Sequence, residues 1–168
     1  MARFLAAIFA VAATLALLAV IVPHGTDVDE RTVVITALLA YPFAAMLLWA
    51  GGRLSRWLVH AILVCGPIMV AVGVHAAGGG RMAGAASLYY LWVAVYIGYY
   101  FPWRAVAAHL MVIGASYAAL LVIEQEPAGP GLVLGMAGAV TFTAVVVGSL
   151  AGRLREQAST DPLTGLPN

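Results

Sequence analysis

Residues 4–22 read FLAAIFAVAATLALLAVIV and carry no charged side chain. A helix needs about 20 consecutive apolar residues to cross the hydrocarbon core of a bilayer, and this stretch has that length. Five further stretches are similarly long and almost free of charge. The sequence therefore predicts an all-α fold, a polytopic membrane protein in which six transmembrane helices form a bundle. The six predicted spans cover residues 4–22, 32–50, 54–74, 83–101, 105–123 and 131–151.

The overall composition excludes an ordinary soluble domain. Hydrophobic residues make up 64% of the 168 residues and charged residues 9%, whereas soluble domains carry roughly 25% charged residues. The formal net charge is +1, and no run of basic residues provides the electrostatic footprint of a nucleic-acid partner. A single cysteine, Cys65, allows no internal disulfide and no cysteine-based metal site. The partner that the composition predicts is the lipid bilayer.

The charged residues indicate the orientation of the chain. Short connections make successive helices antiparallel, so the loops alternate between the two sides of the membrane. If the amino terminus is cytoplasmic, most arginines lie inside, as the positive-inside rule requires. The sequence thus predicts a multi-pass membrane protein with both termini cytoplasmic. The arginines inside are Arg3, Arg53, Arg56, Arg104, Arg153 and Arg155, and the acids outside are Asp27, Asp29, Glu30, Glu124 and Glu126.

The fourth span carries an aromatic pattern. Its members recur at steps of three and four residues, which places them on one helical face. Such a face with polar tips suits a flat hydrophobic ligand or a chromophore. Tight helix packing with anchoring at the membrane interface would produce the same pattern. The candidate ligand face consists of Tyr89, Trp92, Tyr96, Tyr99 and Trp103.

Histidine is the only ionisable residue type expected within the membrane. His60 and His109 each lie about six residues into their spans, roughly 9 Å from the cytoplasmic boundary at 1.5 Å per residue. Two imidazoles at one depth on different helices can be the axial ligands of a b-type haem. Hydrogen bonding to a backbone carbonyl or another helix is the simpler interpretation. His24 and His75 form a looser pair near the outer surface.

The sixth span contains small residues in two groups. Small residues four apart allow close approach of transmembrane helices. The two groups point in different directions, so one is expected to pack within the bundle and the other against a second subunit. This predicts a homodimer through span six and the helix that follows it. The first group is Gly131, Gly135, Ala139 and Thr143, and the second is Gly148 and Gly152.

Beyond the sixth span the chain turns amphipathic over residues 153–160. Leu150, Leu154 and Ala158 repeat at intervals of four, with charged and polar residues between them. Pro162 is expected to end this helix. The linker is about two turns long, so a rotation or translation of span six would reach whatever follows.

Residues 161–168, DPLTGLPN, differ from everything before them. Two prolines and a glycine mark the start of a new folded unit. The segment resembles the motif Asp-x-Leu-Thr-Gly-Leu-x-Asn, which opens the catalytic domain of the GGDEF family of diguanylate cyclases. The expected organisation is a sensory domain at 1–152, a linker helix at 153–160 and the start of a truncated GGDEF domain at 161–168. The matching positions are Asp161, Leu163, Thr164, Gly165, Leu166 and Asn168.

The resemblance implies a function for the whole protein. In this family two catalytic domains meet face to face and condense two GTP molecules to cyclic di-GMP. The chain would then be a membrane-embedded sensory and dimerisation module that regulates a C-terminal cyclase, and would itself be no enzyme. The resemblance also implies that the membrane is the bacterial cytoplasmic (inner) membrane. Mg and GTP would belong only to the missing catalytic domain, so no catalytic residue is assigned. The residues expected to couple the signal are Leu150, Leu154, Ala158, Asp161, Leu163, Leu166 and Asn168.

Other interpretations remain open at this point. The same module can belong to a composite protein in which a phosphodiesterase domain follows the cyclase domain. A b-type haem redox sensor or electron carrier would use His60 and His109. A small transporter is disfavoured, because no span carries Asp, Glu, Lys or Arg near its centre, where ion-coupled transport needs such groups. The sequence does not identify the stimulus.

Overall fold

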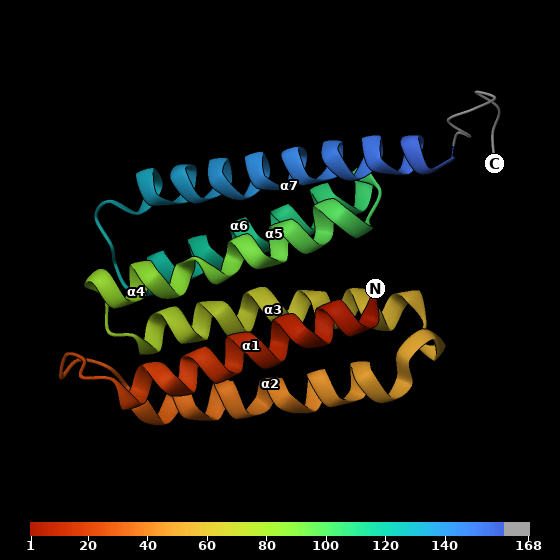
Figure 1. The fold of residues 1–168 in the computed structure, drawn as a ribbon. Helices are drawn as coiled ribbons and strands as arrows, with labels where there is room; N and C mark the ends of the chain where they lie inside the picture. Colours follow the sequence, from red (N-terminus) through yellow and green to blue (C-terminus); the bar gives the residue numbers. More distant parts are fainter. Residues whose placement is uncertain (160–168) are drawn as a thin grey trace.

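The computed structural model describes residues 1–159, and within them every regular element is helical. The prediction of an all-α fold is confirmed. Figure 1 shows long helices lying side by side. The elements are α1 (Ala2–Ile21), α2 (Glu30–Ala50), the 3-10 turn η1 (Gly51–Arg53), α3 (Arg56–Ala76), α4 (Gly80–Ser87), α5 (Tyr89–Tyr100), α6 (Trp103–Ile123) and α7 (Gly129–Ser159).

Six helical segments in the described residues are long and apolar enough to cross a membrane. They coincide with the six predicted spans to within a few residues at each end, which is consistent with a multi-pass membrane protein. Pro42 and Pro67 lie inside α2 and α3 without ending either helix. In hydrocarbon, neighbouring helices and local adjustments satisfy the backbone groups that such a proline frees.

The fourth span differs in one respect from the predicted continuous helix. Its hydrogen-bond ladder is interrupted at Leu88, between α4 and α5. The Ser87 hydroxyl donates to the Gly84 carbonyl at 2.7 Å, and the Leu88 N–H bonds the carbonyl of Ala85, three residues back. Local bonds of this type tighten one turn, while Leu88 keeps helical dihedral angles.

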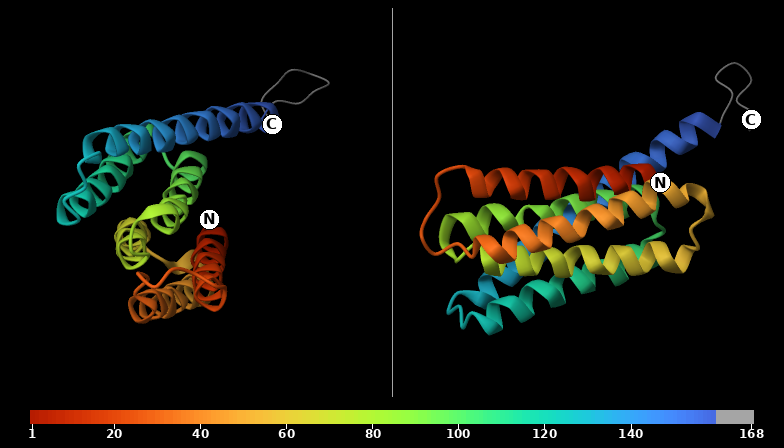
Figure 2. Two further views of the ribbon diagram at one scale, coloured as in Figure 1. Left: turned by 90° about the vertical axis from the view of Figure 1, so that its left-hand side faces the viewer. Right: turned by 90° about the horizontal axis from the view of Figure 1, so that it is seen from below.

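The helices form two groups that meet along α3 and α5. α1, α2 and α3 pack together, α7 packs on α5 and α6, and α3 contacts both α5 and α6. The end-on view in Figure 2 shows the two groups and the long α7 on the outer side of the second one. The last helix is therefore separated from the first three by α5 and α6.

Polar contacts join the two groups at both ends of the α3–α6 pair. His60 Nδ1 lies 2.9 Å from His109 Nε2, and His75 Nδ1 lies 3.3 Å from Glu124 Oε1. Each pair is separated by 49 residues in the sequence. Because the separation is the same at both ends, α3 and α6 run parallel and keep one register along their length.

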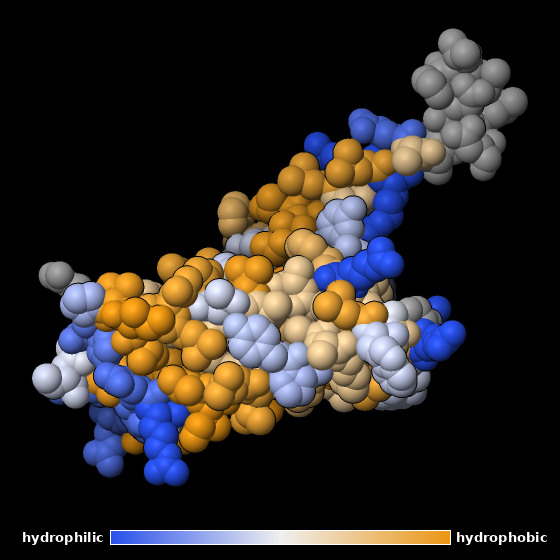
Figure 3. All heavy atoms as spheres, turned by 60° about the horizontal axis from the view of Figure 1, so that its bottom comes forward, coloured by the Kyte–Doolittle hydropathy of each residue, from blue (hydrophilic) through white to orange (hydrophobic). Residues whose placement is uncertain are grey.

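Met1 and the end of α7 lie at the same end of the bundle, as an even number of spans requires (Figure 1). On the face shown in Figure 3, hydrophobic side chains cover the middle and hydrophilic ones gather mainly at the two ends. Trp49, Trp57 and Trp103 are exposed at the end that carries Met1. Tryptophans in this position match the aromatic belt of a membrane interface.

α5 and α7 approach most closely at two glycines. A Cβ atom on Gly98 would lie 2.6 Å from the Ala144 carbonyl oxygen, and one on Gly148 would lie 3.3 Å from the Gly98 carbonyl oxygen. Small residues permit such backbone contact between membrane helices. Gly98 and Gly148 thus determine where α7 lies on α5.

Gly98→Ala should therefore weaken the attachment of α7. The added methyl group has no space, and overpacking of this kind lowers the free energy of unfolding by about 1–3 kcal/mol. The measurement is thermal or SDS-induced unfolding of the purified protein. Gly135→Ala is the matched control, because nothing lies within 4 Å of its added Cβ; it should be neutral or stabilising by up to about 1 kcal/mol. Equal effects of the two substitutions would contradict the close contact.

Candidate functional site

A partly open apolar chamber lies among α1, α2, α3, α4 and α5. Its volume is about 240 Å³. Small residues on three of these helices leave the space open instead of closing it. They include Ala12, Ala16, Ala37, Ala40, Gly66 and Gly73.

The predicted aromatic ligand face contributes three of its five members to the chamber, namely Tyr89, Trp92 and Tyr96. Trp103 lies on the next helix, so the prediction of one shared face is wrong for this residue. Phe101 precedes Pro102 and adopts an extended backbone (φ −115°, ψ 151°), as residues before proline do. The helix therefore ends before Trp103.

Tyr99 is half exposed and does not line the chamber. It faces α7 instead: the Arg155 guanidinium donates to the Tyr99 carbonyl and lies over the Tyr99 ring, 5.5 Å from its centroid. A cation over an aromatic face is attracted by the ring quadrupole. The carboxyl-terminal end of α5 is thus linked to the last turns of α7.

Thr36, Tyr89 and Trp92 are polar residues in the otherwise apolar lining of the chamber. The two hydroxyls and the indole N–H make no hydrogen bond with any described residue. By contrast, Thr14 and Thr143 donate to carbonyls four residues back, each at 2.8 Å. Tyr96 also differs, since its hydroxyl donates to the Met1 carbonyl at 3.4 Å.

The chamber is long and narrow. It extends along α1 from Leu5 to Val20, about 22 Å at 1.5 Å per residue. Empty apolar space between packed helices is unfavourable, because the side chains that surround it lose van der Waals contacts. An apolar molecule in the chamber would restore these contacts.

His60 and His109 form the second candidate site. Their rings are nearly parallel, with centroids 5.2 Å apart and an interplanar angle of 9°. Phe101 lies against both rings, at 4.9 Å from His60 and 5.8 Å from His109. His109 is 4% exposed, and its Nδ1 is buried without a hydrogen-bond partner among the described residues. Because one imidazole must donate to the other, the pair shares a single proton along the 2.9 Å contact.

The imidazoles as they stand do not fit a bis-histidine haem. Two nitrogens that ligate one metal ion at about 2 Å each on opposite sides lie about 4 Å apart, whereas Nδ1 of His60 and Nε2 of His109 are separated by 2.9 Å. The 2.9 Å separation is that of a direct hydrogen bond between the two rings. The described residues also contain no group of three or more His, Cys, Asp or Glu side chains that could hold a metal ion.

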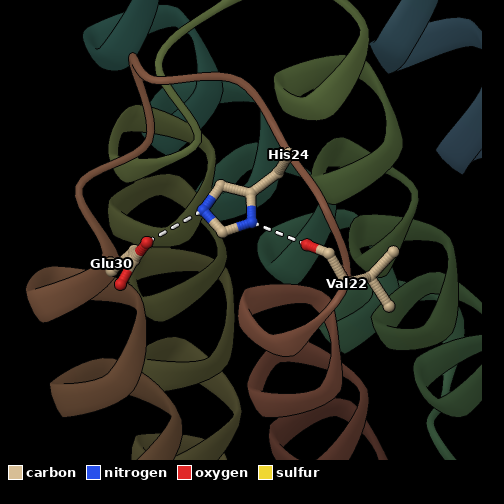
Figure 4. Close-up of polar contacts among 3 residues, drawn as sticks. All are labelled: Val22, His24 and Glu30. Carbon is tan, nitrogen blue, oxygen red and sulfur yellow. Dashed lines mark hydrogen bonds and ion pairs between the residues drawn. The ribbon is translucent and has the colours of Figure 1, made fainter.

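His24 and His75, the looser pair predicted from the sequence, do not bond each other. His24 Nδ1 lies 2.7 Å from the Val22 carbonyl oxygen, and its Nε2 lies 3.1 Å from Glu30 Oε1 (Figure 4). Both partners only accept, so both ring nitrogens are best satisfied when each carries a proton. The Val22 carbonyl, followed by the Glu30 carboxylate, raises the pKa of His24 above its usual value of 6.5.

Asp29 forms the amino-terminal cap of α2 beside this histidine. Its carboxylate accepts from the Thr32 hydroxyl at 2.5 Å and from the Thr32 N–H at 3.2 Å. These bonds, the hydroxyl first, lower the pKa of Asp29 below its usual value of 3.8. The Asp29 N–H also donates to the Ala76 carbonyl at 2.8 Å, which ties this loop to the end of α3.

The predicted coupling seam lies on the last turns of α7. Leu150 and Leu154 are 54% and 59% exposed, and Ala158 is exposed as well. The predicted linker helix is continuous with the sixth span as far as Ser159. The remaining coupling residues, Asp161, Leu163, Leu166 and Asn168, lie outside the described residues.

The two predicted groups of small residues on span six have different surroundings. Gly148 packs on Gly98, and nothing lies within 4 Å of an added Cβ at Gly131, Gly135 or Gly152. The surface around Gly131 and Gly135 is therefore uncovered by the described chain. Gly148, one of the two members of the second group, therefore packs within the bundle on α5.

Comparison with protein families, with curated proteins and with solved structures finds no match for this chain.

Sequence reasoning did not predict the small residues that line the chamber. Ala12, Ala16 and Ala19 recur along α1 at the spacing of one helical face. This signal is visible in the sequence, but it predicts close packing as readily as a void. Only the positions of α2, α3 and α5 decide whether these alanines pack closely or line a void.

The purified protein, produced with haem supplied, should show no Soret band, because His60 and His109 are already bonded to each other. The measurement is the visible spectrum of the wild-type protein. A Soret band that disappears in both His60→Ala and His109→Ala would contradict the direct pairing.

The contribution of His24 to stability should depend on pH. Its pKa is raised in the folded state, so the contribution is fully present below about pH 6.5 and is lost as pH rises through the folded-state pKa. The measurement is the difference in Tm between wild type and His24→Gln across pH 5–9. Glu30→Gln should weaken this dependence without abolishing it, because the Val22 carbonyl remains. A difference that grows with rising pH would contradict the contacts in Figure 4.

Proposed function

We propose that residues 1–159 form a membrane-embedded sensory module that regulates a diguanylate cyclase domain connected to α7. The observation that supports the proposal most strongly is the segment Asp161–Asn168, because it matches the entry motif of GGDEF catalytic domains at six positions. No other feature of the chain points to a specific chemical output. The segment follows a helix that leads out of the bundle.

The shape of α7 suits an output helix. It is one uninterrupted helix of 31 residues, longer than any other in the described chain. A helix of this length spans about 46 Å at 1.5 Å per residue, more than the roughly 30 Å of hydrocarbon in a bilayer. Its last turns therefore extend beyond the hydrocarbon on the side where α7 ends, and a domain connected there would follow its rotation or translation.

The contacts of α7 suggest how a change within the bundle would reach this helix. α7 packs on α5 through Gly98 and Gly148, and Arg155 reaches the inner end of α5 at Tyr99. The opposite side of α5 presents Tyr89, Trp92 and Tyr96 to the chamber. A displacement of α5 by a few tenths of an ångström at the chamber would therefore move the surface on which α7 rests.

The proposal includes an orientation and a second copy of the chain. GTP is cytoplasmic, so both termini would lie in the cytoplasm of a bacterium, in agreement with the distribution of the arginines. Two cyclase domains must meet to condense two GTP molecules, so the module would act as a homodimer. The uncovered surfaces on α7, the glycine group near Gly131 and the seam of Leu150, Leu154 and Ala158, would face the second copy.

A helical phase experiment tests the coupling. One to seven residues are inserted between Arg155 and Ala158 in the protein that carries the catalytic domain, and cyclic di-GMP production is measured. One inserted residue rotates the output by about 100° and should change activity strongly. Seven inserted residues nearly restore the phase and should return activity toward that of the wild type.

The same insertions placed in the loop between α6 and α7, after Glu126, are the control. They lie at the other end of α7 and leave the path from Gly148 to the output unchanged, so activity should show no helical period. A smooth dependence of activity on insertion length between Arg155 and Ala158 would contradict coupling through a rigid helix. Absence of cyclic di-GMP in every variant and in the wild type would contradict the cyclase proposal itself.

A further inference from the structure

The chamber between α1, α2, α3 and α5 has a shape, a lining and a set of unpaired polar groups that together define a class of ligand. We propose that it binds one single-chain lipid, a long hydrocarbon chain that ends in one small polar group such as a carboxylic acid or an alcohol. Binding of the lipid depends on the chamber alone. Only the inference that the bound lipid regulates the output rests on the proposed sensory function.

The dimensions favour a chain over a flat ring system. The chamber has about 240 Å³ distributed along the helices from Leu5 to Val20 of α1, a length of about 22 Å. Distributed over this length, the volume forms a narrow channel and not a broad hollow at one level. A porphyrin or another broad ring needs its volume concentrated at one level, whereas an extended chain needs it distributed in this way.

The lining favours a hydrocarbon occupant. Alanine, glycine, valine, leucine and isoleucine provide most of the lining, and the described residues place no Asp, Glu, Lys, Arg or His there. Burying a charge at such a surface without a partner is strongly unfavourable. The occupant must therefore be apolar along most of its length.

The polar end of the ligand is located by the groups that lack partners. Thr36, Tyr89 and Trp92 line the chamber, and their side-chain hydroxyl and N–H groups make no hydrogen bond to described residues. Thr36 and Tyr89 lie in the outer half of their spans, because α2 and α4 both begin at the outer end, and Trp92 lies near the middle of its span. Tyr96, near the inner end, is already bonded to Met1. The polar group of the lipid therefore lies toward the outer end, and its chain points inward.

Occupation would act on α5. Tyr89, Trp92 and Tyr96 form one wall of the chamber, and the same helix carries Gly98, on which α7 rests. A chain bound beside Trp92 and Tyr96 supports α5 from one side, and an empty chamber leaves that side without support. The lipid is thus positioned to influence α7 without touching it.

Photolabelling tests the proposal on the full chain reconstituted in phosphatidylcholine nanodiscs. The probe is a diazirine analogue of hexadecanoic acid, and unlabelled hexadecanoic acid is the competitor. We expect saturable labelling at one probe per chain, mapped by peptide mass spectrometry to lining residues such as Phe9 and Met69. Labelling confined to outward-facing residues such as Leu18 and Leu134, or unaffected by the competitor, would overturn the proposal.

Ala16→Phe fills the chamber, and Ala7→Phe places the same ring on the outer surface of the same helix as a matched control. Labelling should fall about tenfold or more in Ala16→Phe, because the phenyl ring takes the space that the lipid chain needs, and Ala7→Phe should label like the wild type. Equal labelling of the two variants would contradict binding in the chamber.

A second comparison does not depend on whether Ala16→Phe folds. Thr36→Val with Tyr89→Phe keeps the volume of the chamber and removes two hydroxyls, so labelling by the acid should fall about three- to tenfold relative to a probe without the polar end. Thr143→Val on α7 is the control and should change nothing. An unchanged preference for the acid would overturn the assignment of the polar end. These experiments contain no cyclase, so their failure is distinguishable from a failure of the proposed output.

Discussion

The bundle is apolar around most of each helix, and this constrains everything else in the structure. In hydrocarbon there is no hydrophobic driving force that would select one neighbour for a helix over another. Shape and a small number of polar contacts must make that selection. In this chain the shape is provided by glycines and alanines, and the polar contacts lie mainly near the two ends of the helices. The positions of α3, α5, α6 and α7 follow from these two sources.

The small residues have opposite effects in the two halves of the bundle. Between α5 and α7, Gly98 and Gly148 bring two backbones into contact. Among α1, α2 and α3, residues such as Ala16 and Gly66 line a chamber that no side chain fills. α5 takes part in both environments, with aromatic side chains toward the chamber and a glycine toward α7. This helix is therefore the structural connection between the chamber and the end of the chain.

The sequence predicted the architecture well, because the length of an apolar run is enough to identify a membrane span. It also placed His60 and His109 at one depth, and the structure brings them into direct contact. It failed for Trp103, because periodicity was extended across Phe101–Pro102, where the proline forces the helix to end. It did not predict the chamber, because alanines that allow packing and alanines that line a void look identical in one sequence. Whether Asp161 and Leu163 couple a signal remains a prediction.

The central claim is that α7 delivers its end to the compartment that contains GTP. The most direct measurement is a set of topology reporters fused after Gly25, Gly52, Pro127 and Asn168 and assayed in bacterial cells. The account predicts periplasmic signals after Gly25 and Pro127, and cytoplasmic signals after Gly52 and Asn168. A periplasmic signal after Asn168 would contradict it, because a cyclase domain in that position would have no access to its substrate.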